Sequence, residues 1–281
     1  MSIRIIPRLD IKGPNLVKGI QLEGLRVLGK PSEFAQFYYE NGADEILYMD
    51  VVASLYEKNN LSDLIKEMAS EIFIPLTVGG GIRKLEDINE VLRSGADKIL
   101  INTAAVKNPA FIGEAIKEFG SSTIVVAIEA IKEASDQYLI YTDNGREYTG
   151  IDAVEWAKEV ESLGAGEIVI TSVNREGTGE GFDINLIKII SENINIPLIA
   201  HGGAGAKDDV LQLAKENTVE GISIASLFHY EYINKEEYSY SNEQEGNTDF
   251  LQKRTINKNL APINIKNLKS FLIENGIEIR S

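Results

Sequence analysis

The sequence has no cysteine, which excludes disulfide bonds, thiol nucleophiles and thiolate metal sites. Positive charge is also scarce: 28 lysine and arginine residues face 43 aspartate and glutamate residues, giving a net charge of −15. A phosphate backbone would repel such a surface, so we expect no nucleic-acid partner. The only two histidines, His201 and His229, are far apart and lack an acidic cluster at ligand spacing. We therefore expect no metal site and no cofactor.

Long apolar runs are missing as well. No stretch approaches the ~20 residues that a membrane-spanning helix needs, and the N-terminus has no basic region followed by an apolar run. We expect a cytoplasmic protein without membrane association. The 43% of hydrophobic residues in a chain of 281 is enough for a full core.

The chain carries an internal repeat with an offset of about 120 residues. Three pairs of segments match: 74–82 (IPLTVGGGI) with 196–204 (IPLIAHGGA), 42–50 (GADEILYMD) with 164–172 (GAGEIVITS), and 5–11 (IIPRLDI) with 124–130 (IVVAIEA). A repeat of this length indicates homologous halves, which we place at about 1–120 and 121–281 of one domain.

Short runs rich in Ile, Val and Leu alternate with amphipathic, helix-like stretches such as 31–43 and 85–96. The apolar runs cover residues 3–10, 45–51, 74–80, 98–104, 123–130, 167–173, 196–203 and 221–226. Near-continuous apolar strands are typical of parallel sheets that are buried on both faces. Eight such βα units predict a single (β/α)8 TIM barrel. An open doubly wound sheet is the alternative, but an even repeat favours closure.

Two segments interrupt this alternation. Residues 12–30 are expected to form a long loop after the first strand, and residues 231–262 form a polar insertion before a closing helix at 264–276. Both follow strands, so both are expected at the carboxyl-terminal face of the barrel, where barrel enzymes have their active sites. For 231–262 we favour a mobile surface insertion over a lid.

Glycine turns follow two matching strands of the repeat. Gly80 and Gly81 correspond to Gly202 and Gly203, and glycine lets backbone N–H groups approach an anion closely. One unit further along the chain lie small or polar pairs that can complete a phosphate site: Asn102 with Thr103, and Ala225 with Ser226. The alternative is that the glycines only turn the chain. Two turns in register favour phosphate binding, and hence a substrate with a phosphate at each end.

Asp10 and Glu129 occupy matching positions at the ends of the first and fifth strands. These strands lie opposite each other in an eightfold barrel, so both carboxylates are expected at its mouth. Such a pair is suited to general acid–base chemistry on a substrate held between two anchors. The alternative is a pair of solvated strand-end acids.

A further charged set occurs at the other ends of the strands. Arg4, Glu45, Lys98 and Glu167 stand at the starts of four of them, and their alternating signs permit a ring across the bottom of the barrel. From the residues alone, a structural salt-bridge network explains the set equally well.

In combination, these residues and the motifs RIIPRLD, LVKG, FIPLTVGGGI, INTAAVKNP, VVAIEA, TGIDAVEWA and HGGAG resemble the cyclase subunit of imidazole glycerol phosphate synthase. The resemblance covers residues 3–230 and the last helix. It implies a (β/α)8 barrel that forms a heterodimer with a glutaminase subunit, whose ammonia crosses the barrel along its axis. The ammonia then reacts with a bisphosphorylated ribulosyl aminoimidazole carboxamide, in histidine biosynthesis.

The resemblance also implies roles for individual residues. Asp10 and Glu129 take the places of the catalytic acids, Lys18 matches a lysine on a flexible loop over the active site, and the four-charge ring matches the ammonia gate.

Several positions depart from the family pattern. Glu129 replaces Asp, which moves the carboxylate by about a bond length, and a misplacement of ~1 Å can cost ~100-fold in rate. Arg8 replaces Cys and shares side-chain parity with Asp10, so it should point into the barrel. There it could narrow the ammonia path, or pair with Asp10 or Glu129. Together with Ser172, the remaining candidates for altered specificity are Asn174 and Glu176, each in place of Asp, and His201 in place of Ser.

These departures leave several functions open. The leading hypothesis is the ammonia-dependent lyase/cyclase of the histidine pathway. A close second is a paralogue that uses channelled ammonia to amidate or amidinate a nucleotide-linked sugar for surface polysaccharide. The sister isomerase of the pathway and a non-catalytic activator of a glutaminase are further alternatives.

Overall fold

The described residues of the computed structural model are 2–52, 61–135, 137–235, 238 and 257–280. Within them, eight parallel strands close into a barrel. They are β1 (Arg4–Lys12), β4 (Ile46–Asp50), β5 (Leu76–Gly79), β6 (Lys98–Ile101), β7 (Ile124–Lys132), β10 (Glu167–Ser172), β11 (Leu198–His201) and β12 (Gly221–Ile224). The strands pair in the order β10-β11-β12-β1-β4-β5-β6-β7, and β10 also pairs with β7, which closes the circuit. Each strand coincides with one of the predicted apolar runs, so the predicted TIM barrel is confirmed.

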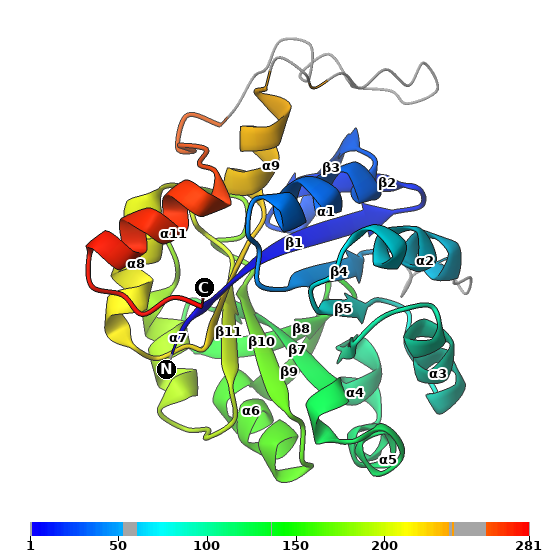
Figure 1. The fold of residues 1–281 in the computed structure, drawn as a ribbon. Coiled ribbons are helices and arrows are strands. Elements are labelled where there is room, and N and C mark those ends of the chain that lie inside the picture. Colours follow the sequence, from blue (N-terminus) through cyan, green and yellow to red (C-terminus); the bar gives the residue numbers. More distant parts are fainter. Residues whose placement is uncertain (1, 53–60, 136, 236–237, 239–256, 281) are drawn as a thin grey trace.

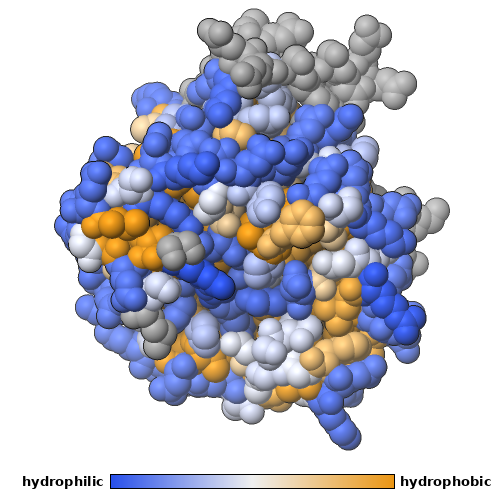
Figure 2. Space-filling view, in the orientation of Figure 1, coloured by the Kyte–Doolittle hydropathy of each residue, from blue (hydrophilic) through white to orange (hydrophobic). Residues whose placement is uncertain are grey.

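Helices surround the barrel (Figure 1). They are α1 (Pro31–Glu40), α2 (Leu61–Glu71), α3 (Leu85–Arg93), α4 (Thr103–Lys107), α5 (Ala110–Phe119), α6 (Ala153–Ser162), α7 (Ile184–Ser191), α8 (Lys207–Glu216), α9 (Ser226–Ile233) and α11 (Ile265–Glu274), with a 3₁₀ turn at Ser121–Thr123. The helices expected at 31–43, 85–96 and 264–276 are α1, α3 and α11. None of the helices in the described part of the chain has the length and apolarity that a membrane crossing requires. The face in Figure 2 is mostly hydrophilic, with apolar groups in separate patches.

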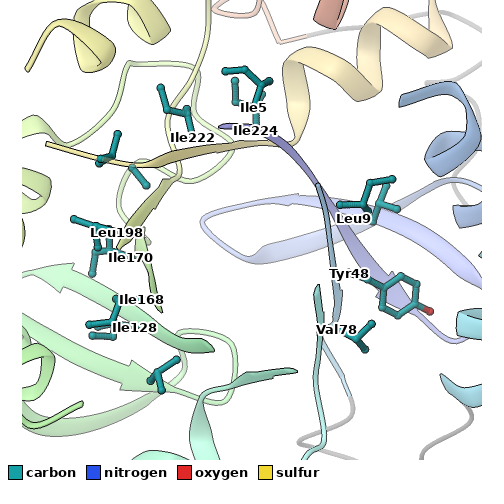
Figure 3. Packing of buried hydrophobic residues seen from close by; sticks show 14 of the residues in the cluster. Ile5, Leu9, Tyr48, Val78, Ile128, Ile168, Ile170, Leu198, Ile222 and Ile224 are labelled. Atoms are coloured by element: carbon teal, nitrogen blue, oxygen red, sulfur yellow. The ribbon is translucent and has the colours of Figure 1, made fainter. Parts of the chain in front are cut away.

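Side chains alternate between the two faces of the barrel strands. Outward side chains such as Ile5, Leu9 and Ile168 are buried in the layer between strands and helices (Figure 3). Inward side chains form a second set, which we call the barrel-interior cluster: Ile6, Val17, Leu47, Met49, Val51, Leu100, Val125, Ala127, Val169 and Ile199. The barrel is therefore packed on both of its faces.

The prediction of a long loop at residues 12–30 was wrong. The segment forms a β-hairpin of β2 (Asn15–Ile20) and β3 (Glu23–Gly29), and β2 pairs antiparallel with the end of β1. Its tip turns at Gln21 and Leu22, both with positive φ, 53° and 63°. Hairpin turns of this kind usually carry Asn and Gly. Because Gln-Leu is not a turn signal, the sequence did not indicate a hairpin.

A second hairpin, also not predicted, follows β7. It consists of β8 (Tyr138–Thr142) and β9 (Glu147–Asp152), and β8 pairs antiparallel with the end of β7. Its turn, Asp143–Asn144–Gly145, has positive φ at each residue and does carry the usual hairpin signal. The hairpins thus extend the two strands that bear Asp10 and Glu129.

The described ends of the polar insertion lie at the carboxyl-terminal face of the barrel, where the two hairpins also lie. The helix α9 continues to Ile233, past the expected start of the insertion at 231, and residues 236–237 and 239–256 lie outside the described part of the chain. The side chains of Asn257 and Asn259 donate hydrogen bonds to the carbonyl oxygen of Thr178, at 3.1 and 3.3 Å. The expectation of a mobile insertion falls on residues that are not described.

The closing helix α11 offers a test of the packing. We expect Leu268→Ala to lower the free energy of unfolding by about 2–5 kcal/mol, because Leu268 is fully buried and its removal leaves a cavity. Ile273→Ala on the same helix is the matched control, since Ile273 is 59% exposed, and it should change stability by less than about 0.5 kcal/mol. Urea denaturation measures both. Equal losses of unfolding free energy for the two substitutions would contradict the packing of α11 against the barrel through Leu268.

Candidate functional site

The two acids predicted from the repeat lie on opposite sides of the barrel. In the order of the strands, β1 and β7 are separated by three strands on either side. Asp10 near the end of β1 and Glu129 on β7 are each only 3% exposed. Their environments differ, and this difference determines what each can do chemically.

Asp10 is held by an arginine of its own strand. Arg8 Nε donates a hydrogen bond to Asp10 Oδ1 at 2.7 Å. Burial alone would raise the pKa of Asp10, but the positive charges of Arg8 and Lys18 outweigh it and lower this pKa below its ordinary value. Asp10 is therefore an ionised carboxylate at neutral pH. As its parity predicted, Arg8 points into the barrel.

Glu129 has a hydrogen bond from a backbone amide, since Gly145 N donates to Glu129 Oε2 at 2.8 Å. Burial raises the pKa of Glu129 to about 7, against the opposing effects of Arg8, this amide and the Asn102 side chain. The protonated form is thus well populated near neutral pH. Two carboxyl groups whose pKa values are driven apart have the properties of a base and an acid.

The first glycine turn borders an open cavity of about 280 Å³. Its lining includes Gly80, Gly81, Asn102, Thr103 and Glu129, so the structure brings this turn, its partner pair and one acid together. Gly80 has φ 106°, and a side chain there would collide with the backbone of Asp50. The position therefore requires glycine.

Asp143 lies within the same cavity. Its backbone N–H donates to Thr103 Oγ1 at 3.1 Å, and its carboxylate lies 3.5 Å from Lys107 Nζ. A carboxylate here occupies groups that would otherwise meet an anion. This residue belongs to the hairpin that the sequence analysis missed, although its Asp-Asn-Gly turn was a usable signal.

The second glycine turn is nearly closed. Gly202 and Gly203, with φ 97° and 113°, border a cavity of only about 10 Å³, together with Glu176, His201, Ala225 and Ser226. This is about the room that one water molecule needs. The predicted members are assembled, but a phosphate would fit only after neighbouring groups move.

The closure comes from the β2–β3 hairpin. Lys18 Nζ on β2 forms a buried ion pair with Glu176 Oε1, and the backbone N–H of Leu22 donates to Glu176 Oε2 at 3.1 Å. Asn144 Nδ2, at the tip of the other hairpin, donates to the carbonyl oxygen of Leu22 at 2.9 Å. The hairpins are thereby joined to each other over the mouth, and Lys18 is paired with Glu176.

His201 is a neutral imidazole in the barrel wall. Its Nδ1 is 3.1 Å from the carbonyl oxygen of Ser223, which accepts the hydrogen bond, while its Nε2 has no hydrogen-bond partner among the described residues. Burial, followed by the charge of Arg8, lowers the pKa of His201 well below its ordinary value. His201 therefore adds no positive charge at neutral pH.

Two of the proposed specificity residues are directed elsewhere. Asn174 Oδ1 accepts a hydrogen bond from the backbone N–H of Lys132 at 2.7 Å, and Ser172 Oγ lies 3.5 Å from Asp183 Oδ2. Within the described part of the chain, neither borders the cavity beside Glu129. They support the loop after β10.

At the opposite end of the barrel, the four predicted charges form a closed ring. Arg4 pairs with Glu45 at 2.8 Å and with Glu167, and Lys98 lies 3.2 Å from Glu45 and 3.1 Å from Glu167. Thr77 Oγ1 also donates to Glu45 Oε1, at 2.5 Å. Between this ring and the acids lies the barrel-interior cluster. The role of the ring as an ammonia gate stays a prediction.

The sequence is similar to known proteins of one family. It matches the family described as "Histidine biosynthesis protein" over residues 4–234. It is 54% identical over 208 residues to the imidazole glycerol phosphate synthase subunit HisF of Legionella pneumophila, covering 74% of this chain and 98% of that protein. The HisF subunit of Hydrogenobaculum sp. is 50% identical over 233 residues (83% and 92% covered), and that of Bacillus cereus is 46% identical over 230 residues (82% and 91%).

The ring yields a stability prediction. Glu45→Gln should lower the free energy of unfolding by roughly 2–3 kcal/mol at neutral pH, because it leaves Arg4 and Lys98 facing each other with half of their compensating charge. Glu114→Gln on the exposed face of α5 is the control and should be near neutral. Chemical denaturation of both variants makes the comparison. If Glu45→Gln leaves the free energy of unfolding unchanged, the ring adds nothing to stability.

The first glycine turn yields a binding prediction. Gly80→Ala should weaken binding of inorganic phosphate at least about tenfold, since the added Cβ forces the turn away from its left-handed conformation. Gly113→Ala in α5, where a Cβ meets open space, should leave binding unchanged. Titration calorimetry on both folded variants is the measurement. Unchanged affinity of Gly80→Ala would remove the turn as an anion site.

Proposed function

Because the chain belongs to the histidine biosynthesis protein family, as a HisF-type cyclase subunit of imidazole glycerol phosphate synthase, we propose that Asp10 and Glu129 carry out its chemistry. The observation that supports these roles is the opposed pair of buried carboxyl groups, of which Asp10 is ionised near pH 7 and Glu129 keeps its proton in a large share of molecules. The chain is a lyase/cyclase, and we expect it to act in the cytoplasm on a bisphosphorylated ribulosyl aminoimidazole carboxamide.

The two glycine turns would anchor the ends of this substrate. Each turn comes from one of the halves predicted at about 1–120 and 121–281. Gly80, Gly81, Asn102 and Thr103 form the open anchor beside Glu129. The anchor at Gly202, Gly203, Ala225 and Ser226 would open when Lys18 leaves Glu176 for the substrate. Binding between two anchors places the reacting carbons between the acids.

Proton transfer then follows from the ionisation of the two acids. As ammonia attacks the substrate carbonyl, a C–N bond forms and the nitrogen must lose a proton, which Asp10 as a carboxylate can accept. The carbonyl oxygen must gain two protons to leave as water, and protonated Glu129 can supply the first. The second is the proton that Asp10 took from nitrogen, and nitrogen gives its second proton back to Glu129 as the imine forms, so the count balances. General acid–base assistance of this kind contributes about 10²–10⁴ in rate. The new nitrogen then bonds to the carbon that links the two halves of the substrate, and the C–N bond from that carbon to the aminoimidazole breaks. This closes the imidazole ring and releases the aminoimidazole carboxamide ribonucleotide, whose amino nitrogen takes up a proton.

The ammonia would come from a second protein. The relatives are named as subunits of a synthase, which implies a partner subunit. We propose a glutaminase that forms a heterodimer at the end of the barrel bearing Arg4, Glu45, Lys98 and Glu167. A charged ring whose members neutralise each other suits a passage that admits uncharged ammonia and rejects ions.

A second candidate acceptor remains, supported by one observation. Arg8 occupies the space below Asp10, where the family has a smaller residue by resemblance, and this changes the shape and charge of the mouth. The candidate is a nucleotide-linked sugar that receives the ammonia in place of the histidine-pathway substrate.

Turnover of the bisphosphate with an ammonium salt tests the proposal without a glutaminase. We expect wild-type turnover, with kcat per free ammonia falling as pH rises through about 7, because Glu129 loses its proton there. Glu129→Gln should lower kcat about 100-fold and abolish this alkaline limb. Glu114→Gln makes the same substitution at an exposed position and is the matched control, so it should keep the wild-type kcat and pH profile.

Two outcomes would contradict the proposal. Substrate that binds to wild type without turnover would move the chemistry to another acceptor, and nucleotide sugars would be tested next. A Glu129→Gln variant that keeps the wild-type pH profile would remove Glu129 as the acid.

A further inference from the structure

Arg8 is a charged side chain in the interior of the barrel, and it is only 2% exposed. Besides the bond from Nε to Asp10, its Nη1 donates to Thr171 Oγ1 at 3.4 Å. Thr171 belongs to β10, and the strands β11 and β12 separate β10 from β1. The guanidinium group therefore extends across the interior, from the wall that carries it towards the far wall.

The remaining guanidinium nitrogen of Arg8, Nη2, is buried and has no hydrogen-bond partner among the described residues. A buried cation with an unused donor is costly, and it is retained only where a charge partner compensates. The compensating group is Asp10. Lys18 also acts on Asp10 through its charge, but its ion pair is with Glu176, so it does not hold the Asp10 carboxylate in place.

We propose that Arg8 is a positioning residue for the reaction: braced on Thr171, it fixes the Asp10 carboxylate and keeps it as the base opposite Glu129. The inference rests on the function proposed above and assigns a task to a residue that the family resemblance leaves unexplained. Arginine suits this task because its planar fork bonds two groups in fixed directions, which lysine cannot do.

The groups that face Asp10 come from several elements. Those that act on Asp10 or on its partner Arg8 are Lys18 on β2, Glu129 on β7, Glu176 after β10, His201 on β11 and His229 on α9. Both histidines are neutral at pH 7, because burial lowers their pKa values. Without Arg8, burial and the neighbouring carboxylates would raise the pKa of Asp10, so that its base form would be lost at a higher pH.

Two substitutions separate charge from geometry. Arg8→Met removes the charge and roughly keeps the length of the side chain. Arg8→Lys keeps the charge but loses the planar guanidinium group that bonds both Asp10 and Thr171. The carboxyl resonance of Asp10, followed by ¹³C NMR and assigned with Asp10→Asn, reports its titration directly. Arg93→Met, on the exposed end of α3, is the matched control.

For Arg8→Met, we expect the Asp10 midpoint and the acid limb of ammonia-dependent kcat to move up together, by about 1–3 pH units. For Arg8→Lys, we expect a midpoint near that of wild type with kcat at least about tenfold lower, because the carboxylate is ionised but less well placed. Arg93→Met should match wild type in both measurements.

An unchanged Asp10 midpoint in Arg8→Met overturns the proposal, and so does a wild-type kcat in Arg8→Lys. If Arg8→Met fails to fold, Arg8→Lys still decides through its rate. If wild type does not turn over the bisphosphate, the proposed function fails, while the NMR titration of Asp10 still decides the role of Arg8.

Discussion

Closure of the parallel sheet is the constraint on which the rest of this structure depends. Once β10 pairs with β7, every second side chain of the barrel strands must fit inside one enclosed space. The middle of that space is filled by the barrel-interior cluster, so charged groups are confined to its two ends. At both ends they are enclosed by strands, and each charge must find an opposite charge or lose its own. Both the ring and the mouth around Asp10 and Glu129 meet this requirement.

The two ends answer it differently. At the ring, two cations and two anions alternate, and each carboxylate is shared between neighbours. At the mouth, Arg8 forms its ion pair with Asp10 and Lys18 with Glu176. Among the described residues, Glu129 receives hydrogen bonds from a backbone amide and an amide side chain, and Arg8 acts on it through its charge without a hydrogen bond. Glu129 therefore responds to burial by holding its proton. The pKa values of Asp10 and Glu129 differ because a cation is paired with Asp10, whereas the described residues provide no ion pair for Glu129. The repeat nevertheless places the two acids at equivalent positions.

Most of the framework was predictable from the sequence, because it depends on local and periodic signals. The apolar runs predicted the barrel strands, and the repeat predicted that Asp10 and Glu129 would face each other. The parity of β1 predicted the direction of Arg8 and left its partner open between Asp10 and Glu129. The structure shows the bond to Asp10, and the reach of Arg8 to Thr171 depends on the closed barrel. Likewise, the pair of Lys18 with Glu176 joins residues 158 positions apart, and no local pattern marks it. The first hairpin was missed because its left-handed turn uses Gln21 and Leu22, whereas the signal of the second was present and overlooked.

The hydrogen bond between Asn144 and Leu22 has a consequence for the timing of the catalytic cycle. It ties the tip of one hairpin to the other, while the amide of Gly145 holds Glu129 and Glu176 holds Leu22. Either hairpin can therefore leave the other only after the bond between Asn144 and Leu22 breaks. On the proposed function, breaking this one bond would open the way out for both products of the reaction. Product escape would be one concerted step, and premature loss of a half-reacted substrate would be disfavoured for as long as the tie holds.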